Sequence, residues 1–227
     1  MNKSVPPLFD LMMFDLDGTL IATELEICDA VNATLRHFDL PEVAATQVRD
    51  WIGHGTRELL IQALASSGKP DVTAVRASAS LSLIGAEFDR HYQSRCGTRS
   101  QLYPRVRETL IALRRRGVKL AVVTNKEARY SEAVLKAHQL APLLDLVVSG
   151  DTLPTKKPDP AGIARCLAQF GVPRQRALFV GDSSIDVATA RNAAVSVWLL
   201  PYGYNMGQPI EACAPDRVIA DCSLLLN

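Results

Sequence analysis

Residues 8–20 read Leu-Phe-Asp-Leu-Met-Met-Phe-Asp-Leu-Asp-Gly-Thr-Leu, an apolar run that ends with Asp15 and Asp17 two residues apart. In an extended strand residues i and i+2 point the same way, so the two carboxylates can converge, and Gly18 lets the backbone turn tightly beside them. Two like charges this close repel each other. The pattern therefore favours a divalent cation between them or a carboxyl group that keeps its proton. The alternative is a simple turn after a strand, because Asp and Gly are common turn residues.

Length and composition indicate a globular chain without a strong electrostatic partner. The 227 residues are 48% hydrophobic, which is enough for one large domain or two modest ones. The formal net charge is +1, so no overall field attracts nucleic acid or anionic lipid. The one basic cluster, residues 114–116, precedes Gly117 and is typical of a helix C-terminus. No stretch is long and apolar enough to span a bilayer, so we expect neither a nucleic-acid partner nor membrane insertion.

The cysteines and histidines form neither a metal-binding nor a disulfide pattern. Five cysteines are scattered along the chain without a C-x-x-C pair, and four histidines lie far apart without H-x-x-x-H spacing. These spacings argue against a zinc site and favour a reducing compartment. The first residues also lack the uninterrupted apolar core of a secretion signal. We therefore expect a cytoplasmic protein.

A helical pattern occupies the chain between residues 21 and 99. It contains no strong strand run, and its apolar residues recur at helical spacing in three segments. The Ser- and Ala-rich stretch Ser66–Ser80, which includes Gly68 and Pro70, is expected to be a loop between helices. The three segments are marked by Ile27, Val31 and Leu35, by Leu59, Leu60, Ala63 and Leu64, and by Leu81, Ile84 and Phe88.

After Pro104 the chain alternates between helical patterns and short apolar strands. Strands are expected at 118–123, 143–148, 177–180 and 195–200. Such alternation implies right-handed crossovers and a doubly wound parallel sheet with helices on both faces. The predicted fold class is therefore α/β, a Rossmann-like core with a helical domain inserted after its first strand. Residues 1–20 and 100–227 would share the core, and residues 21–99 would form the inserted domain.

The carboxyl ends of these strands carry polar residues. Ligands bind beyond this edge of an open parallel sheet, so the residues there are candidates for a site. Four strands deliver small or acidic side chains to one edge, which chance composition would seldom do. They are Asp15 and Asp17 after the first strand, residues 124–126 after the second, residues 149–151 after the third, and Gly181 and Asp182 after the fourth.

Four short motifs, in this order, resemble those of the haloacid dehalogenase superfamily of phosphatases. They are Phe14–Leu20, Val122–Asn125, Lys157-Pro158 and Gly181–Asp186. A single D-x-D-G-T is only suggestive, whereas four motifs at strand ends across nearly the whole chain are specific. The insert also lies where that superfamily has its helical cap. The resemblance implies that the chain cleaves a small phosphate ester.

The resemblance implies a catalytic role for three residues. Asp15 corresponds to the aspartate that attacks phosphorus and forms an aspartyl-phosphate. Asp17 would give a proton to the leaving alcohol and later accept one from water, and we expect crowding by other carboxylates to help it hold that proton. Lys157 would place positive charge against the developing negative charge, and the Lys-Pro pattern selects it over Lys156.

The same resemblance implies Mg²⁺ as the cofactor, and a carboxylate-rich site supplies the oxygen ligands that this ion prefers. The expected ligands are the Asp15 carboxylate, the Asp17 backbone carbonyl and the Asp182 carboxylate. Asp186 stands in a capping-box pattern. It is therefore expected to cap a helix or orient Lys157 in preference to touching the metal.

Further segments, residues 30–32, 51–55, 150–154, 202–205 and 215–219, are similar to those of bacterial phosphoglycolate phosphatases within the superfamily, and this similarity suggests 2-phosphoglycolate as the substrate. The similarity covers segments of both insert and core, and it departs from the family pattern at Ala22-Thr23 and at Glu127-Ala128. Alternatives are a sugar-phosphate or nucleotide phosphatase, a phosphoglucomutase-like phosphotransferase, or a catalytically silent phosphate-binding module. The intact acidic motifs argue against the silent module. The expected partner is a small-molecule phosphate ester, and the expected assembly is a monomer or homodimer.

Four further residues are expected to contact the substrate. Thr124 and Asn125 would hydrogen-bond phosphate oxygens, unless they are turn residues alone. His54 and Arg57 lie in a segment that resembles the part of the cap that inspects the leaving group. Arg57 would pair with a substrate carboxylate, or else be an exposed residue of a first helical turn.

Overall fold

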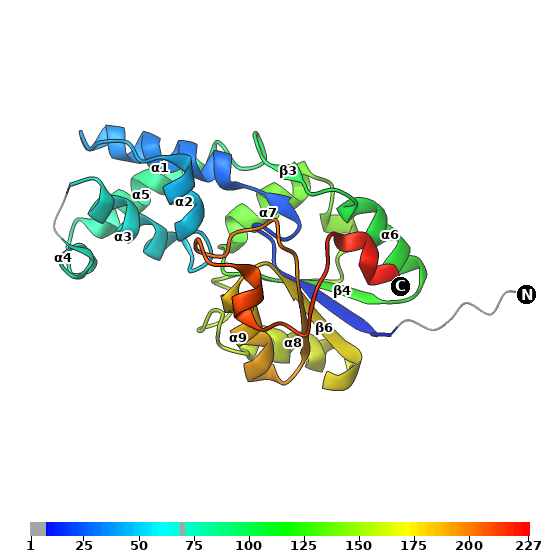
Figure 1. Ribbon diagram of the computed structural model, residues 1–227. Coiled ribbons are helices and arrows are strands. Elements are labelled where there is room, and N and C mark those ends of the chain that lie inside the picture. The colour runs from blue at the N-terminus through cyan, green and yellow to red at the C-terminus, as the bar shows by residue number, and fades with distance from the viewer. Residues whose placement is uncertain (1–7, 69–70) are drawn as a thin grey trace, which may run out of the picture.

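The computed structural model describes residues 8–68 and 71–227 and contains a six-stranded sheet in the order β5-β4-β1-β6-β7-β8 (Figure 1). Every neighbouring pair in this sheet is parallel, which confirms the predicted α/β class. The first strand is shorter than the apolar run that predicted it. The strands are β1 (Leu11–Phe14), β4 (Lys119–Val123), β5 (Leu146–Val148), β6 (Ala177–Gly181), β7 (Ser196–Leu199) and β8 (Arg217–Val218).

Helices cover both faces of the sheet. Successive side chains of β1 point to opposite faces, and those on each face pack against helices. Met12 and Phe14 pack with residues of α6 and α7, whereas Leu11 and Met13 pack with residues of α8 and α9. All four side chains are at most 2% exposed, so β1 is the centre of the core. Burial of one side chain of this size contributes roughly 1.5–3 kcal/mol. The helices are α6 (Val106–Arg115), α7 (Ala128–Ala137), α8 (Ala161–Phe170) and α9 (Ser184–Ala193).

Five helices between β1 and α6 share a hydrophobic core of their own. Its fully buried members include Val48, Ile61 and Phe88, and it takes in Tyr130 of α7 and Tyr204. In Figure 1 these helices gather at the end of the molecule away from β4 and α6. The exact domain boundaries stay a prediction. The helices are α1 (Glu24–His37), α2 (Ala45–Trp51), α3 (Thr56–Ser66), α4 (Val72–Arg76) and α5 (Leu81–Gln93).

Two of these helices differ from the sequence pattern. Each buries a single apolar residue, Val48 in α2 and Val75 in α4, and one buried residue produces no helical periodicity. The prediction that Ser66–Ser80 is a loop is therefore wrong for the residues of α4, where the Asp71 side chain accepts the N–H of Ala74 at 2.9 Å. Pro70 and residues 1–7 lie outside the described residues. Among the described residues, no helix has the length and apolar character needed to cross a membrane.

The two connections between the insert and the sheet lie side by side. β2 (Ile21–Ala22) pairs antiparallel with β3 (Gln101–Leu102) in a small ribbon of its own. Beside this ribbon the fully buried Glu26 accepts the backbone N–H groups of Gly97 and Ser100 at 2.9 and 3.1 Å. The chain therefore leaves the core and re-enters it at one place, close to the loop that follows β1.

Candidate active site

Three acidic side chains meet at the carboxyl edge of the sheet. Asp15 follows β1, and its N–H donates to the carbonyl of Val180 in the neighbouring strand β6 at 2.9 Å. This pairing puts Asp15 next to Asp182, which follows β6, and next to Asp186 in the first turn of α9. Carboxylate oxygens of Asp15, Asp182 and Asp186 all lie within 4.8 Å of one another. The cluster is buried, so the charges repel strongly unless a cation compensates them.

Lys157 supplies part of that compensation. Its Nζ lies 2.8 Å from Oδ1 of Asp15 and 2.8 Å from Oδ1 of Asp186, and its side chain is 4% exposed. Burial alone would lower the pKa of Lys157, but the two carboxylates outweigh burial and raise it. Asn125 holds the Lys157 backbone in place, donating to its carbonyl at 3.0 Å and accepting its N–H at 2.8 Å. The neighbouring Lys156 is partly exposed and lies 3.4 Å from Glu127.

The acidic cluster fits a divalent cation. Burial raises the pKa of Asp15 to about 6 although Lys157 opposes it, and burial together with Asp186 and Asp15 raises the pKa of Asp182 well above its usual value. Oδ1 of Asp15 is buried and lies 2.8 Å from the Lys157 ammonium within the described part of the chain. A hard cation would relieve the repulsion between the three carboxylates, since carboxylate oxygens are its preferred ligands. These residues could therefore hold a metal ion.

Asp186 has other partners that occupy its carboxylate. Oδ2 accepts the N–H groups of Asp182 and Ser183 at 3.1 Å each and the Ser183 hydroxyl at 2.8 Å, while Oδ1 faces Lys157. It therefore both caps the start of α9 and contacts the lysine. Asp182 is held by two hydrogen bonds, because its Oδ2 accepts the N–H of Tyr204 at 2.6 Å and its Oδ1 accepts the Thr19 hydroxyl.

Asp17 lies apart from the acidic cluster. Its carboxylate accepts the Thr23 hydroxyl at 2.7 Å and lies 3.0 and 3.1 Å from Nζ of Lys126. The expected crowding of Asp17 by other carboxylates is thus not found, because its side chain turns toward an ammonium group. Lys126 directly follows Thr124-Asn125 at the end of β4, and sequence reasoning gave it no role. Its position just beyond the end of β4 was the feature of the sequence that could have identified Lys126 as a site residue.

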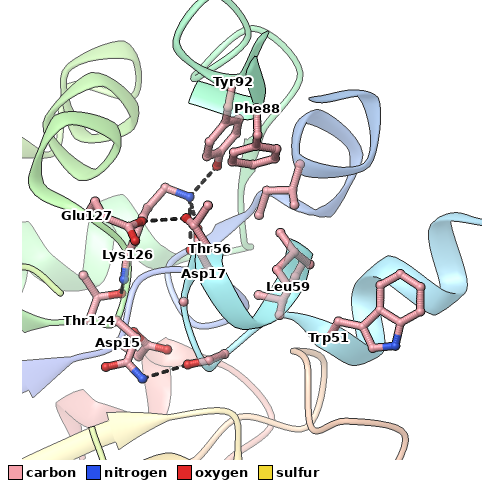
Figure 2. A pocket seen from close by; sticks show the side chains of 15 residues that line it. Asp15, Asp17, Trp51, Thr56, Leu59, Phe88, Tyr92, Thr124, Lys126 and Glu127 are labelled. Atoms are coloured by element: carbon pink, nitrogen blue, oxygen red, sulfur yellow. Dashed lines mark hydrogen bonds and ion pairs between the residues drawn. The ribbon is translucent and has the colours of Figure 1, made fainter. Parts of the chain in front are cut away.

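A small cavity of about 40 Å³ lies between the strand ends and the insert (Figure 2). A cavity of this size holds a few water molecules or a small ligand. The sheet side contributes polar residues and the insert contributes mainly apolar ones. The polar lining from the sheet side consists of Asp15, Asp17, Thr124, Asn125, Lys126 and Glu127, and the insert contributes Ile27, Trp51, Ile52, Gly53, Gly55, Thr56, Leu59, Phe88 and Tyr92.

Three of the four expected substrate contacts have side chains that are already engaged or turned away. The Asn125 amide bridges Lys157 and the carbonyl of Gly53, the latter at 2.8 Å, so its side chain is not available to phosphate. His54 and Arg57 are exposed and do not line the cavity, and Arg57 lies 3.4 Å from the Arg76 carbonyl on the outside of the insert. The φ angles of +130° at Gly53 and +89° at Gly55 belong to a loop that presents backbone to the cavity.

Known proteins are similar to this chain in sequence and in fold. The chain matches the family model described as haloacid dehalogenase-like hydrolase over residues 12–200. It is 40% identical over 217 residues to the phosphoglycolate phosphatase of Pseudomonas putida, covering 95% of this chain and 78% of that protein. It is 37% identical over 219 residues to the phosphoglycolate phosphatase of Vibrio cholerae, covering 96% and 95%. The crystal structure of a predicted phosphoglycolate phosphatase from Haemophilus somnus is similar with a TM-score of 0.90 and 34% identity, covering 96% and 97%.

Proposed function

Because the chain belongs to the haloacid dehalogenase-like hydrolases, we propose that it is a Mg²⁺-dependent phosphatase that hydrolyses 2-phosphoglycolate to glycolate and phosphate. The observation that carries the proposal is the convergence of a buried lysine and three buried carboxylates on the carboxyl end of β1, beside a small cavity. Positive charge and oxygen ligands at one point are what phosphoryl transfer requires.

In the proposed reaction Asp15 attacks phosphorus, so a bond forms between its carboxylate oxygen and phosphorus while the bond to the ester oxygen breaks. Lys157 touches Asp15 and would stabilise the negative charge that develops on the phosphoryl oxygens. Asp17 lines the same cavity and would give its proton to the leaving oxygen. A water molecule then attacks the aspartyl-phosphate, Asp17 accepts a proton from it, and phosphate leaves.

Mg²⁺ would be held by the carboxylates of Asp15 and Asp182 and by the backbone carbonyl of Asp17. When bound, it would neutralise charge on the phosphate oxygens and favour the attack by an anionic nucleophile. Asp186 would hold Lys157 at 2.8 Å and keep α9 capped, and the Thr124 hydroxyl would bind a phosphate oxygen. In this scheme the chain's own groups supply the nucleophile, the proton carrier and one positive charge.

The size of the cavity favours a short substrate. About 40 Å³ is far below the volume of pockets that hold drug-sized ligands, roughly 300–1,000 Å³. A two-carbon phosphate ester needs less rearrangement of the insert than a hexose phosphate or a nucleotide does. We propose that residues 21–99 act as a cap that closes over the ester and excludes water during the first step.

The nucleophile can be tested directly. Asp15→Asn should lower kcat for p-nitrophenyl phosphate and for 2-phosphoglycolate by at least about 10³-fold, because it removes the attacking group. EDTA should abolish turnover by the unmodified chain and excess Mg²⁺ should restore it. A matched control is Asp10→Asn, which removes a partly exposed carboxylate paired with Arg176 just before β1. More than a tenth of the original kcat in Asp15→Asn, or full activity in EDTA, would contradict the proposal.

The substrate requires a second measurement. The kcat/KM values for 2-phosphoglycolate, a hexose phosphate and a nucleoside monophosphate should rank in that order. If the hexose phosphate ranks first, the phosphatase class stands and the substrate proposal fails.

A further inference from the structure

Lys126 is the one cationic side chain among the described residues that line the cavity. The other charged groups of the lining are the carboxylates of Asp15, Asp17 and Glu127. These three carboxylates would repel a second anionic group on the substrate. Within the cavity, the favourable position for such a group is therefore next to Lys126. Figure 2 shows Lys126 extending toward Tyr92, on the side of the cavity away from Asp15.

The Lys126 ammonium is buried and partly paired. Its side chain is 3% exposed, its Nζ lies at hydrogen-bond distance from Asp17 and the Tyr92 hydroxyl, and it lies 4.7 Å from the centre of the Tyr92 ring. Burial raises the pKa of Tyr92 well above its usual value, so the hydroxyl stays protonated. A buried ammonium is costly unless anions compensate it, so this site attracts negative charge. The buried Glu26 adds to the compensation from a greater distance.

The two buried lysines of the site therefore have different positions relative to the reaction. Lys157 contacts the proposed nucleophile Asp15, at the phosphoryl end, and Lys126 contacts the proposed proton carrier Asp17, at the leaving-group end. In 2-phosphoglycolate the carboxylate is one carbon beyond the ester carbon. An ester oxygen within reach of Asp17 thus puts the carboxylate within reach of the group that Asp17 itself contacts.

Resting on the proposed function, we propose that Lys126 binds the substrate carboxylate and is the residue that selects phosphoesters whose leaving group carries an anion close to the ester oxygen. The ammonium has three N–H donors and the substrate carboxylate would accept one of them, shared with or displacing Asp17. Arg57, the arginine that the sequence suggested for this role, lies outside the cavity.

The test compares two esters of the same length. The substrates are 2-phosphoglycolate and 2-hydroxyethyl phosphate, which has a neutral hydroxymethyl group in place of the carboxylate. The measured quantity is kcat/KM for 2-phosphoglycolate divided by kcat/KM for 2-hydroxyethyl phosphate, and this ratio should be above one in the unmodified chain. Lys126→Met should lower the ratio at least about 30-fold, mainly because KM for 2-phosphoglycolate rises. The ratio is independent of how much of the variant is folded, because both values refer to the same active fraction.

Lys156→Met is the matched control. Lys156 is an exposed lysine that lies 3.4 Å from Glu127 and does not line the cavity, so its loss should leave the ratio unchanged. An unchanged ratio in Lys126→Met overturns the inference, as does a loss of both activities at an unchanged Tm, since Lys126 would then act on every ester. If Lys126→Met does not fold, Lys126→Gln, which keeps a hydrogen-bonding group without the charge, is judged by the same ratio.

Failure of this inference and failure of the proposed function give different results. If the unmodified chain hydrolyses both esters equally, and does so only with Asp15 present, the phosphatase stands and the role of Lys126 is overturned. If it hydrolyses neither ester nor an aryl phosphate, the proposed function itself fails.

Discussion

At the scale of single residues, Asp182 depends on two glycines that leave room for its carboxylate. A Cβ atom on Gly18 or Gly203 would lie 2.3 or 2.2 Å from Oδ2 of Asp182, much closer than atoms can approach. Gly18 also has a φ of +87°, whereas Gly203 has no positive φ and is restricted by space alone. A substitution at Gly203 should therefore displace the Asp182 carboxylate without also straining the backbone, unlike a substitution at Gly18.

Gly203→Ala should lower kcat at least about 10-fold and raise the Mg²⁺ concentration needed for half-maximal activity, because Asp182 must move away from the added methyl group. Steady-state kinetics across a Mg²⁺ titration measures both effects. Gly85→Ala is the matched control, since a Cβ at this position in α5 meets no atom within 4 Å. Unchanged Mg²⁺ dependence in Gly203→Ala would show that Asp182 does not need its present position.

The sequence predicts where the backbones of the site residues lie, but it does not predict the direction of every side chain. Asp15 and Asp182 follow strands, so the sheet fixes where their backbones lie, and Lys157 belongs to a recognisable motif. The direction of the Asp17 side chain depends on Thr23 and Lys126, which come from different segments. No spacing in the sequence encodes that three-way contact.

At the scale of elements, the ribbon of β2 and β3 and the buried Glu26 form the link between the insert and the sheet. Glu26 lies in the first turn of α1 and holds the returning chain at residues 97–100 through backbone N–H groups. Burial raises the pKa of Glu26, and the Lys126 ammonium opposes this effect. Its other carboxylate oxygen, Oε1, accepts no hydrogen bond within the described residues.

The sign of the resulting pH dependence follows from this raised pKa. The folded chain binds the Glu26 proton more tightly than the unfolded chain, so the free energy of unfolding falls as the pH rises above the ordinary value of 4.5. Glu26→Gln keeps an oxygen acceptor and removes the ionisation. The Tm of the variant should therefore rise relative to that of the unmodified chain as the pH increases above 4.5. Thermal unfolding followed by circular dichroism measures the difference, and a difference that is constant with pH would contradict the prediction.

The sequence predicted the helices that bury several apolar residues and missed those that bury only one. The segments around α1, α3 and α5 each bury several residues at helical spacing and were expected. The short helices α2 and α4 bury one residue each, and the two-residue strands β2, β3 and β8 have no room for an alternating pattern. Their formation depends on tertiary contacts.

At the scale of the whole molecule, the insert and the sheet have separate hydrophobic cores, and one of the chain's two tryptophans reports on each. Trp51 packs against the core of the insert, and Trp198 belongs to the core of the sheet. Single-tryptophan variants, Trp198→Phe and Trp51→Phe, therefore report on the insert and on the sheet separately.

Phe88→Ala should destabilise the insert by about 3–5 kcal/mol, because Phe88 is fully buried in that core. In urea unfolding, the midpoint reported by Trp51 should fall more than the midpoint reported by Trp198. For Phe179→Ala, which lies in the core of the sheet, the midpoint reported by Trp198 should fall more than the midpoint reported by Trp51. Equal shifts of both tryptophan signals would mean that residues 21–99 do not form a unit of their own.

The sheet order was the part of the architecture that the sequence could not supply. Alternating helices and strands predict a parallel sheet with helices on both faces. They do not say which strands are neighbours. The observed order puts β1 between β4 and β6, where Leu11 pairs with Lys119 on one side and with Ala177 on the other.

That central place of β1 has a consequence for synthesis. A ribosome releases β1 long before β4 and β6, and at about 5–20 residues per second the wait lasts roughly 5 to 30 seconds. During that time the apolar strand that precedes Asp15 has neither of its pairing partners. The five helices of the insert are contiguous in the chain and bury residues mainly against one another. They are the first part of the nascent chain that can become compact, and they emerge directly behind the strand that must wait.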